Sequence, residues 1–174
     1  MTIEIRTAVA DDGTALAELL NEIIDIGGTT AFLTPFDAEA IRSKFIELEL
    51  GISCVVAERR GEILGFQTLE WCDPSYTGPE PLPLDWALIS SFVRHGHGRK
   101  GIAHRLFDTT LTHARTAGVS VIDATIRADN ASGLGYYDAI GFVDFQRLKD
   151  VPLADGSKVD RVRKRLDLGN HPGK

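Results

Sequence analysis

The chain has 174 residues, a formal net charge of −6 and ordinary globular proportions, with 43% hydrophobic and 25% charged residues. This length suffices for a sizeable core, and Cys54 and Cys72 lack the spacing of a metal or redox motif. The sequence has no apolar run near the roughly 20 residues that span a bilayer and no signal-peptide pattern, so we expect a cytoplasmic protein without a membrane partner. The acidic balance disfavours nucleic acid, which selects a broadly basic face.

Hydrophobic periodicity and turn residues predict blocks of strand and helix along the chain. A strand at 3–8 precedes two helices. Asp11 or Asp12 caps the first, which Gly27 ends, and the second runs from Asp37 to Leu48. The later elements are strands at 53–58, 63–71 and 85–93, a helix at 102–117, a strand at 119–128, a helix at 131–140, and strands at 142–148 and 159–168.

This order predicts a mixed α+β sheet. Consecutive hairpin strands come before residue 93, and a strand–helix–strand unit comes after it, which disfavours an all-parallel sheet. We expect a single domain over residues 1–168 and a flexible tail over 169–174.

The most informative segment is the glycine-rich stretch 93–105, which lies between a predicted strand and a predicted helix. Glycine allows backbone N–H groups to turn inward, and a helix N-terminus adds partial positive charge, so the segment is typical of a phosphate-binding loop. The residues that give it this character are Arg94, Gly96, Gly98, Arg99, Lys100, Gly101 and Arg105.

Gly96, Gly98 and Gly101 also spell the G-x-G-x-x-G pattern of a dinucleotide-binding loop. That pattern normally follows the first strand of a long parallel series, whereas here it follows the fourth, with too little chain beyond it for repeated strand–helix units. Asp123 lies about 20 residues further on, near the place of a ribose-binding acid, but inside a predicted strand. We therefore disfavour a dinucleotide ligand.

Two stretches resemble motifs of the GNAT acetyltransferase superfamily. Residues 93–103, VRHGHGRKGIA, are similar to the V-x-P-x-x-Q/R-x-x-G-x-G/A motif, and residues 130–142, NASGLGYYDAIGF, are similar to the N-x-x-(A/G)-x-x-x-Y-E-x-x-G-F helix. Found in order, with one helix and one strand between them, they make the resemblance strong. His95 and Gly98 depart from the proline and the Gln/Arg that are common at those positions.

The resemblance implies a GNAT-like fold, with a central twisted, mostly antiparallel sheet and helices on both faces. It also implies acetyl-CoA as cosubstrate, held between strands 85–93 and 119–128, which splay apart. No metal is expected, since His95 and His97 have metal-like spacing but no acidic or cysteine companions. The implied cofactor-binding residues are Phe92, Val93, Gly98, Arg99, Lys100, Gly101, Ile102, Ala103 and Asn130.

Amine attack on the thioester expels a thiolate, which needs a proton. Tyr137 occupies the tyrosine position of the second motif and is the predicted general acid, because a phenol with a pKa near 10 can supply that proton. Tyr136 points about 100° away on the same helix and is expected to pack or to face solvent.

The attacking amine must also lose a proton, and Glu70, Asp73 and Asp85 are the candidate bases. Glu70 is preferred because strand alternation places it on one face with Leu64, Phe66 and Thr68.

The predicted acceptor is the primary amine of a small molecule. A protein N-terminus or lysine is a second interpretation, and a non-catalytic CoA-binding sensor is a third. The segment from 20 to 32 faintly resembles the phosphinothricin-acetyltransferase-like branch. A basic lining would favour amino acids, and an acidic lining would favour polyamines or aminoglycosides. A homodimer is an expectation that the resemblance alone carries.

Overall fold

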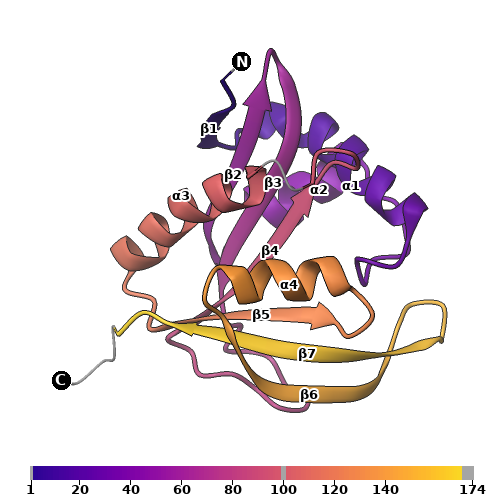
Figure 1. Cartoon of the computed structure of the whole chain (residues 1–174), viewed down its shortest axis with the longest axis vertical. Helices are drawn as coiled ribbons and strands as arrows, with labels where there is room; N and C mark the ends of the chain where they lie inside the picture. The colour runs from indigo at the N-terminus through magenta and orange to yellow at the C-terminus, as the bar shows by residue number, and fades with distance from the viewer. Residues whose placement is uncertain (1, 99–100, 170–174) are drawn as a thin grey trace.

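The computed structural model describes residues 2–98 and 101–169. Within these ranges, seven strands form one sheet in the order β1-β2-β3-β4-β5-β7-β6 (Figure 1). The strands are β1 (Glu4–Thr7), β2 (Gly51–Arg59), β3 (Glu62–Trp71), β4 (Trp86–Val93), β5 (Val121–Arg127), β6 (Val143–Pro152) and β7 (Lys158–Asp167). The helices are α1 (Gly13–Ile26), α2 (Ala38–Ile41), α3 (Ile102–Ala117) and α4 (Ala131–Ala139), with a 3₁₀ turn at Ala10–Asp12 and a π turn at Arg42–Ile46.

The sheet is mostly antiparallel, as predicted. All neighbouring strands pair antiparallel except β4 and β5, which are parallel because α3 carries the chain back between them. Figure 1 shows β2, β3 and β4 running at a steep angle to β5, β6 and β7. The sheet therefore consists of two halves that meet at the β4–β5 pair.

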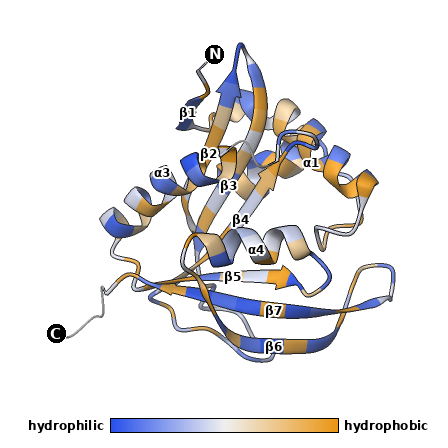
Figure 2. Ribbon diagram, in the orientation of Figure 1, coloured by the Kyte–Doolittle hydropathy of each residue, from blue (hydrophilic) through white to orange (hydrophobic). Residues whose placement is uncertain are grey.

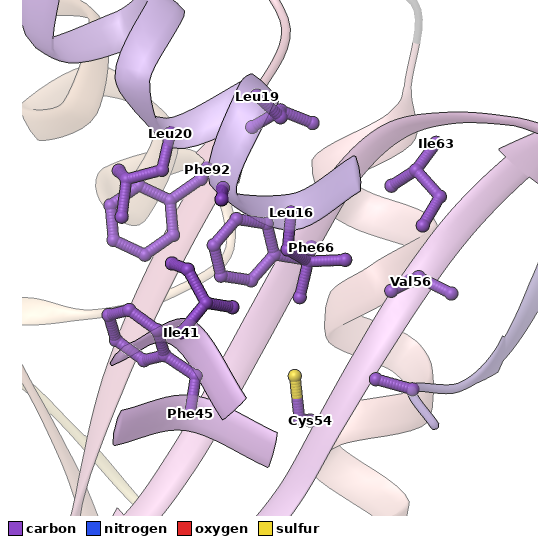
Figure 3. Close-up of a cluster of buried hydrophobic side chains, with 12 residues drawn as sticks. Leu16, Leu19, Leu20, Ile41, Phe45, Cys54, Val56, Ile63, Phe66 and Phe92 are labelled. Atoms are coloured by element: carbon purple, nitrogen blue, oxygen red, sulfur yellow. The ribbon is translucent and has the colours of Figure 1, made fainter. Parts of the chain in front are cut away.

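Helices cover both faces of the sheet, which confirms the predicted architecture. On β4, Phe92 packs into a cluster with α1 and α2 (Figure 3), whereas Ile89 packs into a second cluster with α3 and α4. We call these two sides the α1 face and the α3 face. On β5, Ala124 and Ile126 lie on the α3 face, so Asp123, which alternates with them, lies on the α1 face.

The second predicted helix is shorter than expected. It ends at Ile46 and not at Leu48, because its last turn is a π turn in which the amide of Glu47 donates to the carbonyl of Arg42 at 2.8 Å. The wider turn ends the regular ladder early, a feature that apolar periodicity does not encode.

The prediction that Glu70 shares a face with Leu64, Phe66 and Thr68 is wrong for Leu64. Phe66 packs on the α1 face, but Leu64 packs under α3 with Val55. The pairing of β2 with β3 shifts register between Ala57 and Glu58, and this irregularity turns Leu64 to the opposite face. Strand alternation therefore holds from Phe66 onward and fails before it.

A buried lysine attaches α4 to the C-terminal half of the sheet. Although β7 is largely hydrophilic (Figure 2), the Lys164 side chain is only 4% exposed. Its ammonium donates to the carboxylates of Asp138, at the end of α4, and of Asp144 on β6. The two aspartates are more than 60% exposed, so the lysine carries the buried charge of this group.

Removing the charges of the two aspartates should therefore destabilise the protein more than removing the charge of Lys164. We expect the double variant Asp138→Asn/Asp144→Asn to lower the free energy of unfolding by about 1–3 kcal/mol, because it leaves a buried ammonium without a counter-charge. Lys164→Met should cost less, since it removes that charge and keeps most of the volume. Urea denaturation compares the midpoints at constant m-value. A larger loss in Lys164→Met would show that stem packing, rather than charge, holds α4.

Candidate active site

The site is built where β4 and β5 separate. Only three residue pairs join them, from Trp86–Val121 to Leu88–Asp123. Beyond Leu88, β4 continues along β3 as far as Val93, while β5 continues along β7 as far as Arg127. The splay that the resemblance implied is confirmed, and a cleft of about 1100 Å³ lies between the two strands.

The glycine-rich loop begins on fixed contacts at the end of β4. The Arg94 amide donates to the carbonyl of Leu64 at 2.8 Å, and its guanidinium donates to the Glu22 carboxylate of α1 at 2.7 Å. Gly96 and Gly101 have φ values of 76° and 74°, in the region that glycine tolerates best. The loop therefore needs these two glycines for its backbone path.

The loop leads directly into the N-terminus of α3. Gly101 is the cap residue, and the amide of Arg105 makes the first helical hydrogen bond, to the Gly101 carbonyl. The amides of Ile102, Ala103 and His104 precede it and have no partner within the helix. These three residues line the cleft, so the site presents free donors and the positive end of a 16-residue helix.

Two adjacent tyrosines of α4 line the cleft from the α3 face. The Tyr137 hydroxyl lies 2.9 Å from the Ser91 Oγ of β4. Gln67 Nε2 donates to this Ser91 Oγ at 2.8 Å. The Tyr136 hydroxyl donates to the Ala103 carbonyl at 2.9 Å. Tyr136 is thus packed, as predicted, but it also lines the cleft, which was not predicted. Ser91 and Gln67 were missed by sequence reasoning, because their strands give no motif.

Burial sets the protonation of these phenols. It raises the pKa of Tyr137 well above its usual range, against a smaller lowering by the Ser91 hydrogen bond, and it raises the pKa of Tyr136 to about 12. Tyr137 is only 6% exposed. Both phenols therefore keep their protons at neutral pH, and Tyr137 can act as a donor to a negative atom in the cleft.

The predicted site residues lie away from the cleft, outside the described residues, or around the cleft. Glu70 lies half-buried on the α1 face of β3 and is not among the residues that line the cleft. Burial raises its pKa, while Lys44 lowers it by a smaller amount. Arg99 and Lys100 lie outside the described residues. The predicted residues that the structure brings together around the cleft are Phe92, Val93, Gly98, Gly101, Ile102, Ala103, Asn130 and Tyr137.

Asn130 has a structural task besides lining the cleft. Its Oδ1 accepts from the Gly133 amide at 2.9 Å and caps α4, and its Nδ2 donates to the Thr29 carbonyl at 3.1 Å. Beside it, the Arg127 guanidinium donates to the Thr30 carbonyl at 3.2 Å. The segment after α1 is thus held across the cleft by the C-terminal end of β5 and the cap of α4.

A second carboxylate lies on the α1 face, where the strands separate. Asp123 is 1% exposed, and its Oδ2 accepts a hydrogen bond from Thr125 Oγ1 at 2.9 Å, while its Oδ1 is buried without a hydrogen-bond partner among the described residues. Burial raises the pKa of Asp123 to about 6, and Thr125 and Arg163 oppose the shift. Thr125 lines the cleft. Sequence reasoning considered Asp123 only as a disfavoured ribose-binding acid inside a strand, and not as a base.

Residues 2–98 and 101–169 contain no candidate metal cluster and no candidate membrane-spanning helix. No group of three or more histidine, cysteine, aspartate or glutamate side chains is arranged to hold a metal ion. In the same part of the chain, no helix has both the length and the apolar character needed to cross a membrane.

A family model described as "Acetyltransferase (GNAT) family" matches residues 17–142. The chain belongs to the GNAT acetyltransferase family. Among solved GNAT-like structures, an N-acetyltransferase from Staphylococcus aureus Mu50 has a TM-score of 0.80 at 23% identity, covering 97% of this chain and 99% of that one. The yncA protein of Salmonella typhimurium, solved with its cofactor acetyl-CoA, has a TM-score of 0.81 at 20% identity, covering 99% and 98%. At these identities, both show a shared fold.

A relative of named activity is similar over nearly its whole length. The L-methionine sulfoximine/L-methionine sulfone acetyltransferase of Pseudomonas aeruginosa PAO1 is 26% identical over an alignment of 174 positions, which covers 97% of this chain and 96% of that protein. The homodimer and the phosphinothricin-acetyltransferase-like branch stay predictions for this GNAT chain.

The titration of Asp123 should appear in the stability of the protein. Because its pKa is about 6 in the folded state and 3.8 in the unfolded reference, folding favours the protonated form, and this stabilisation is lost as the pH rises through about 6. Asp123→Asn should leave Tm unchanged near pH 4, and it should raise Tm by about 5 °C above roughly pH 7.

Thermal denaturation at several pH values measures this difference. Asp155→Asn is the matched control, because hydrogen bonds from Ser157 lower the pKa of that exposed carboxyl, and its effect should be small and of opposite sign. A Tm difference for Asp123→Asn that does not change with pH would contradict a raised pKa.

Proposed function

We propose that the protein is an acetyl-CoA-dependent N-acetyltransferase that acetylates the primary amine of a small molecule by direct attack in a ternary complex. The observation that carries the proposal is the cleft between β4 and β5, which has free helix amides at one end and the buried Tyr137 phenol on its wall. Membership of the GNAT family supports the same reaction class.

The residues around the glycine-rich loop fit coenzyme A. The amides at the start of α3 suit a pyrophosphate, since an anion there meets both donors and the helix dipole. A Cβ added at Gly98 would meet no atom within 4 Å among the described residues, so backbone can approach a ligand closely there. The unpaired edges of Phe92 and Val93 suit an extended pantetheine arm.

The bridged cleft favours a small acceptor over a protein. The hydrogen bonds from Asn130 to Thr29 and from Arg127 to Thr30 hold the segment after α1 across the α1 face. A polypeptide would have to displace this segment, whereas a small amine would not. The Pseudomonas relative, whose name gives small molecules as its substrates, supports the same choice.

Tyr137 is the proposed acid. Acetyl-CoA supplies the thioester, and the leaving sulfur must gain a proton when its bond to the acetyl carbon breaks. Because Ser91 Oγ accepts from Gln67, the Ser91 hydroxyl can donate to Tyr137, and the phenol hydrogen is then free to point into the cleft. Burial keeps that hydrogen on the phenol until the thiolate develops.

Replacement of this phenol should slow turnover without weakening cofactor binding. We expect Tyr137→Phe to lower kcat by about tenfold or more, with the KM for acetyl-CoA nearly unchanged, because the ring stays and only the proton donor is lost. The assay is thiol release from acetyl-CoA over a panel of amino acids, polyamines and aminoglycosides. Tyr76→Phe, which alters a half-exposed tyrosine in the loop between β3 and β4, is the control.

The same panel separates the alternative functions. Equal kcat in wild type and Tyr137→Phe would exclude Tyr137 as the acid. Turnover of peptides but of no small amine would favour the protein-acceptor function. Acetyl-CoA binding without turnover of any acceptor would favour a sensor.

Two carboxylates of the α1 face are candidates to take the amine proton. Glu70 remains the base predicted from sequence. Asp123 has the additional support that Thr125, its hydrogen-bond donor, lines the cleft. Thr125 can accept a proton from the ammonium while it passes its own to Asp123, whose pKa of about 6 suits a base that works near neutral pH. We therefore prefer Asp123 acting through Thr125.

The pH dependence of kcat/KM should distinguish the two carboxylates. Wild type should lose activity as the pH falls through about 6, because Asp123 becomes protonated. Asp123→Asn should lower kcat/KM by roughly 100-fold and abolish this acidic limb, whereas Glu70→Gln should retain it. Thr125→Val should lower kcat/KM as Asp123→Asn does, because it removes the hydroxyl that links the amine to Asp123. Thr125→Ser keeps a hydroxyl and should retain activity. Loss of the limb in Glu70→Gln alone would make Glu70 the base.

A further inference from the structure

Three arginines lie together on the α1 face of β5 and β7. Arg127 on β5 is the register partner of Arg161 on β7, and Thr125 is the partner of Arg163. Residues paired across neighbouring strands lie on the same face, roughly 5 Å apart at the backbone. The three cationic side chains therefore share the side of the sheet on which Arg127 donates to Thr30.

Two of the three arginines are neutralised or engaged by the protein. Arg127 forms a two-point contact with Asp129, at 2.9 and 2.8 Å, besides its bond to Thr30. Arg163 donates to the Glu80 carbonyl and to Gln146, both at 2.9 Å. The Arg161 side chain, by contrast, has neither a hydrogen bond nor an ion pair with any part of the chain that the structure describes, and its Nε is buried.

This arrangement is unfavourable in the free protein. Burial, and then the charges of Arg127 and Arg163, lower the pKa of Arg161. Like charges placed directly opposite each other on neighbouring strands are destabilising. A guanidinium in such a place remains protonated and lacks a counter-ion. An anion bound beside Arg161 would oppose this unfavourable charge.

The location of Arg161 indicates which anion. Arg161 lines the cleft, together with Thr125, Ile23 and Phe32 of the α1 side. The free amides of α3, which suit the phosphates of coenzyme A, adjoin the α3 face, where Tyr137 also lies. Arg161 therefore faces the part of the cleft left to the acceptor.

We propose that Arg161 binds the carboxylate of the acceptor, so that the acceptor is an amino acid whose amine lies near Thr125. This inference rests on the proposed function. A planar guanidinium matches a carboxylate through two parallel hydrogen bonds, and the two terminal nitrogens of Arg161, Nη1 and Nη2, can provide both donors from the wall of the cleft. Arg161 and Thr125 are diagonal neighbours on paired strands, roughly 7–8 Å apart, a span that a flexible arginine stem can shorten to that of an α-amino acid.

The test compares acids with their neutral amides. Each of a panel of α-amino acids, L-methionine sulfone among them, is assayed beside its carboxamide by thiol release from acetyl-CoA. The proteins are wild type, Arg161→Gln, Arg161→Lys and the control Arg165→Gln. Arg165 lies on the same strand and face, but it stacks on Trp86 and Phe145 outside the cleft. Calorimetric titration of the same acids into protein saturated with CoA measures binding without turnover.

We expect wild type to have a higher kcat/KM for each amino acid than for its carboxamide. Arg161→Gln should lower kcat/KM for that acid roughly 10- to 100-fold and leave the amide and the KM for acetyl-CoA unchanged. Arg161→Lys should keep part of the preference for the acid over its amide. The control Arg165→Gln should keep all of it. The Tm of Arg161→Gln should equal or exceed that of wild type, because a like-charge contact is removed.

Several results would overturn the assignment. An equal preference for acids and amides in wild type, or an equal loss for both in Arg161→Gln, would exclude Arg161 as the carboxylate receptor while leaving the acetyltransferase function intact. If no amine is acetylated, the proposed function fails, and the titration decides: binding of an acid that Arg161→Gln abolishes would sustain the subsite, and no binding across the panel would reject it.

Discussion

The architecture depends on the early end of the pairing between β4 and β5. A parallel pair normally continues for the length of the shorter strand, but here it stops at Leu88–Asp123 because the two halves of the sheet turn away from each other. The backbone groups that would have paired beyond this point face the cleft from both sides. Backbone groups that do not pair across strands need another partner, and in a cleft this partner is water or a bound ligand.

Two positive regions in a chain of net charge −6 sit at this gap for different physical reasons. At the N-terminus of α3, the positive potential comes from backbone dipoles and free amides. On β5 and β7 it comes from side chains, most of which the protein neutralises with its own carboxylates and carbonyls. Because the chain as a whole is negatively charged, these regions favour the binding of a negatively charged ligand at this gap.

Much of the fold was predictable because its signals are local. Strand alternation, helix caps and the spacing of two motifs gave the order of the elements and placed Tyr137 on the cleft wall. The contacts of Tyr137 were not predictable in this way, since Ser91 is 46 residues distant and Gln67 is 24 residues from Ser91. The register shift that turns Leu64 arises from pairing between two strands, which periodicity within one strand does not contain.

The alternation of side chains along β5 has a consequence for how such a protein can diversify. Successive residues of one strand belong to different halves of the cleft: Ala124 and Ile126 support the helices that bear the Tyr137 phenol and the proposed phosphate-binding amides, while Thr125 and Arg127 face the opposite side. Substitutions on the second set, and on the facing positions of β7, leave the first set in place. A lineage can therefore exchange one acceptor for another within the same strand and keep an intact acetyl-transfer apparatus.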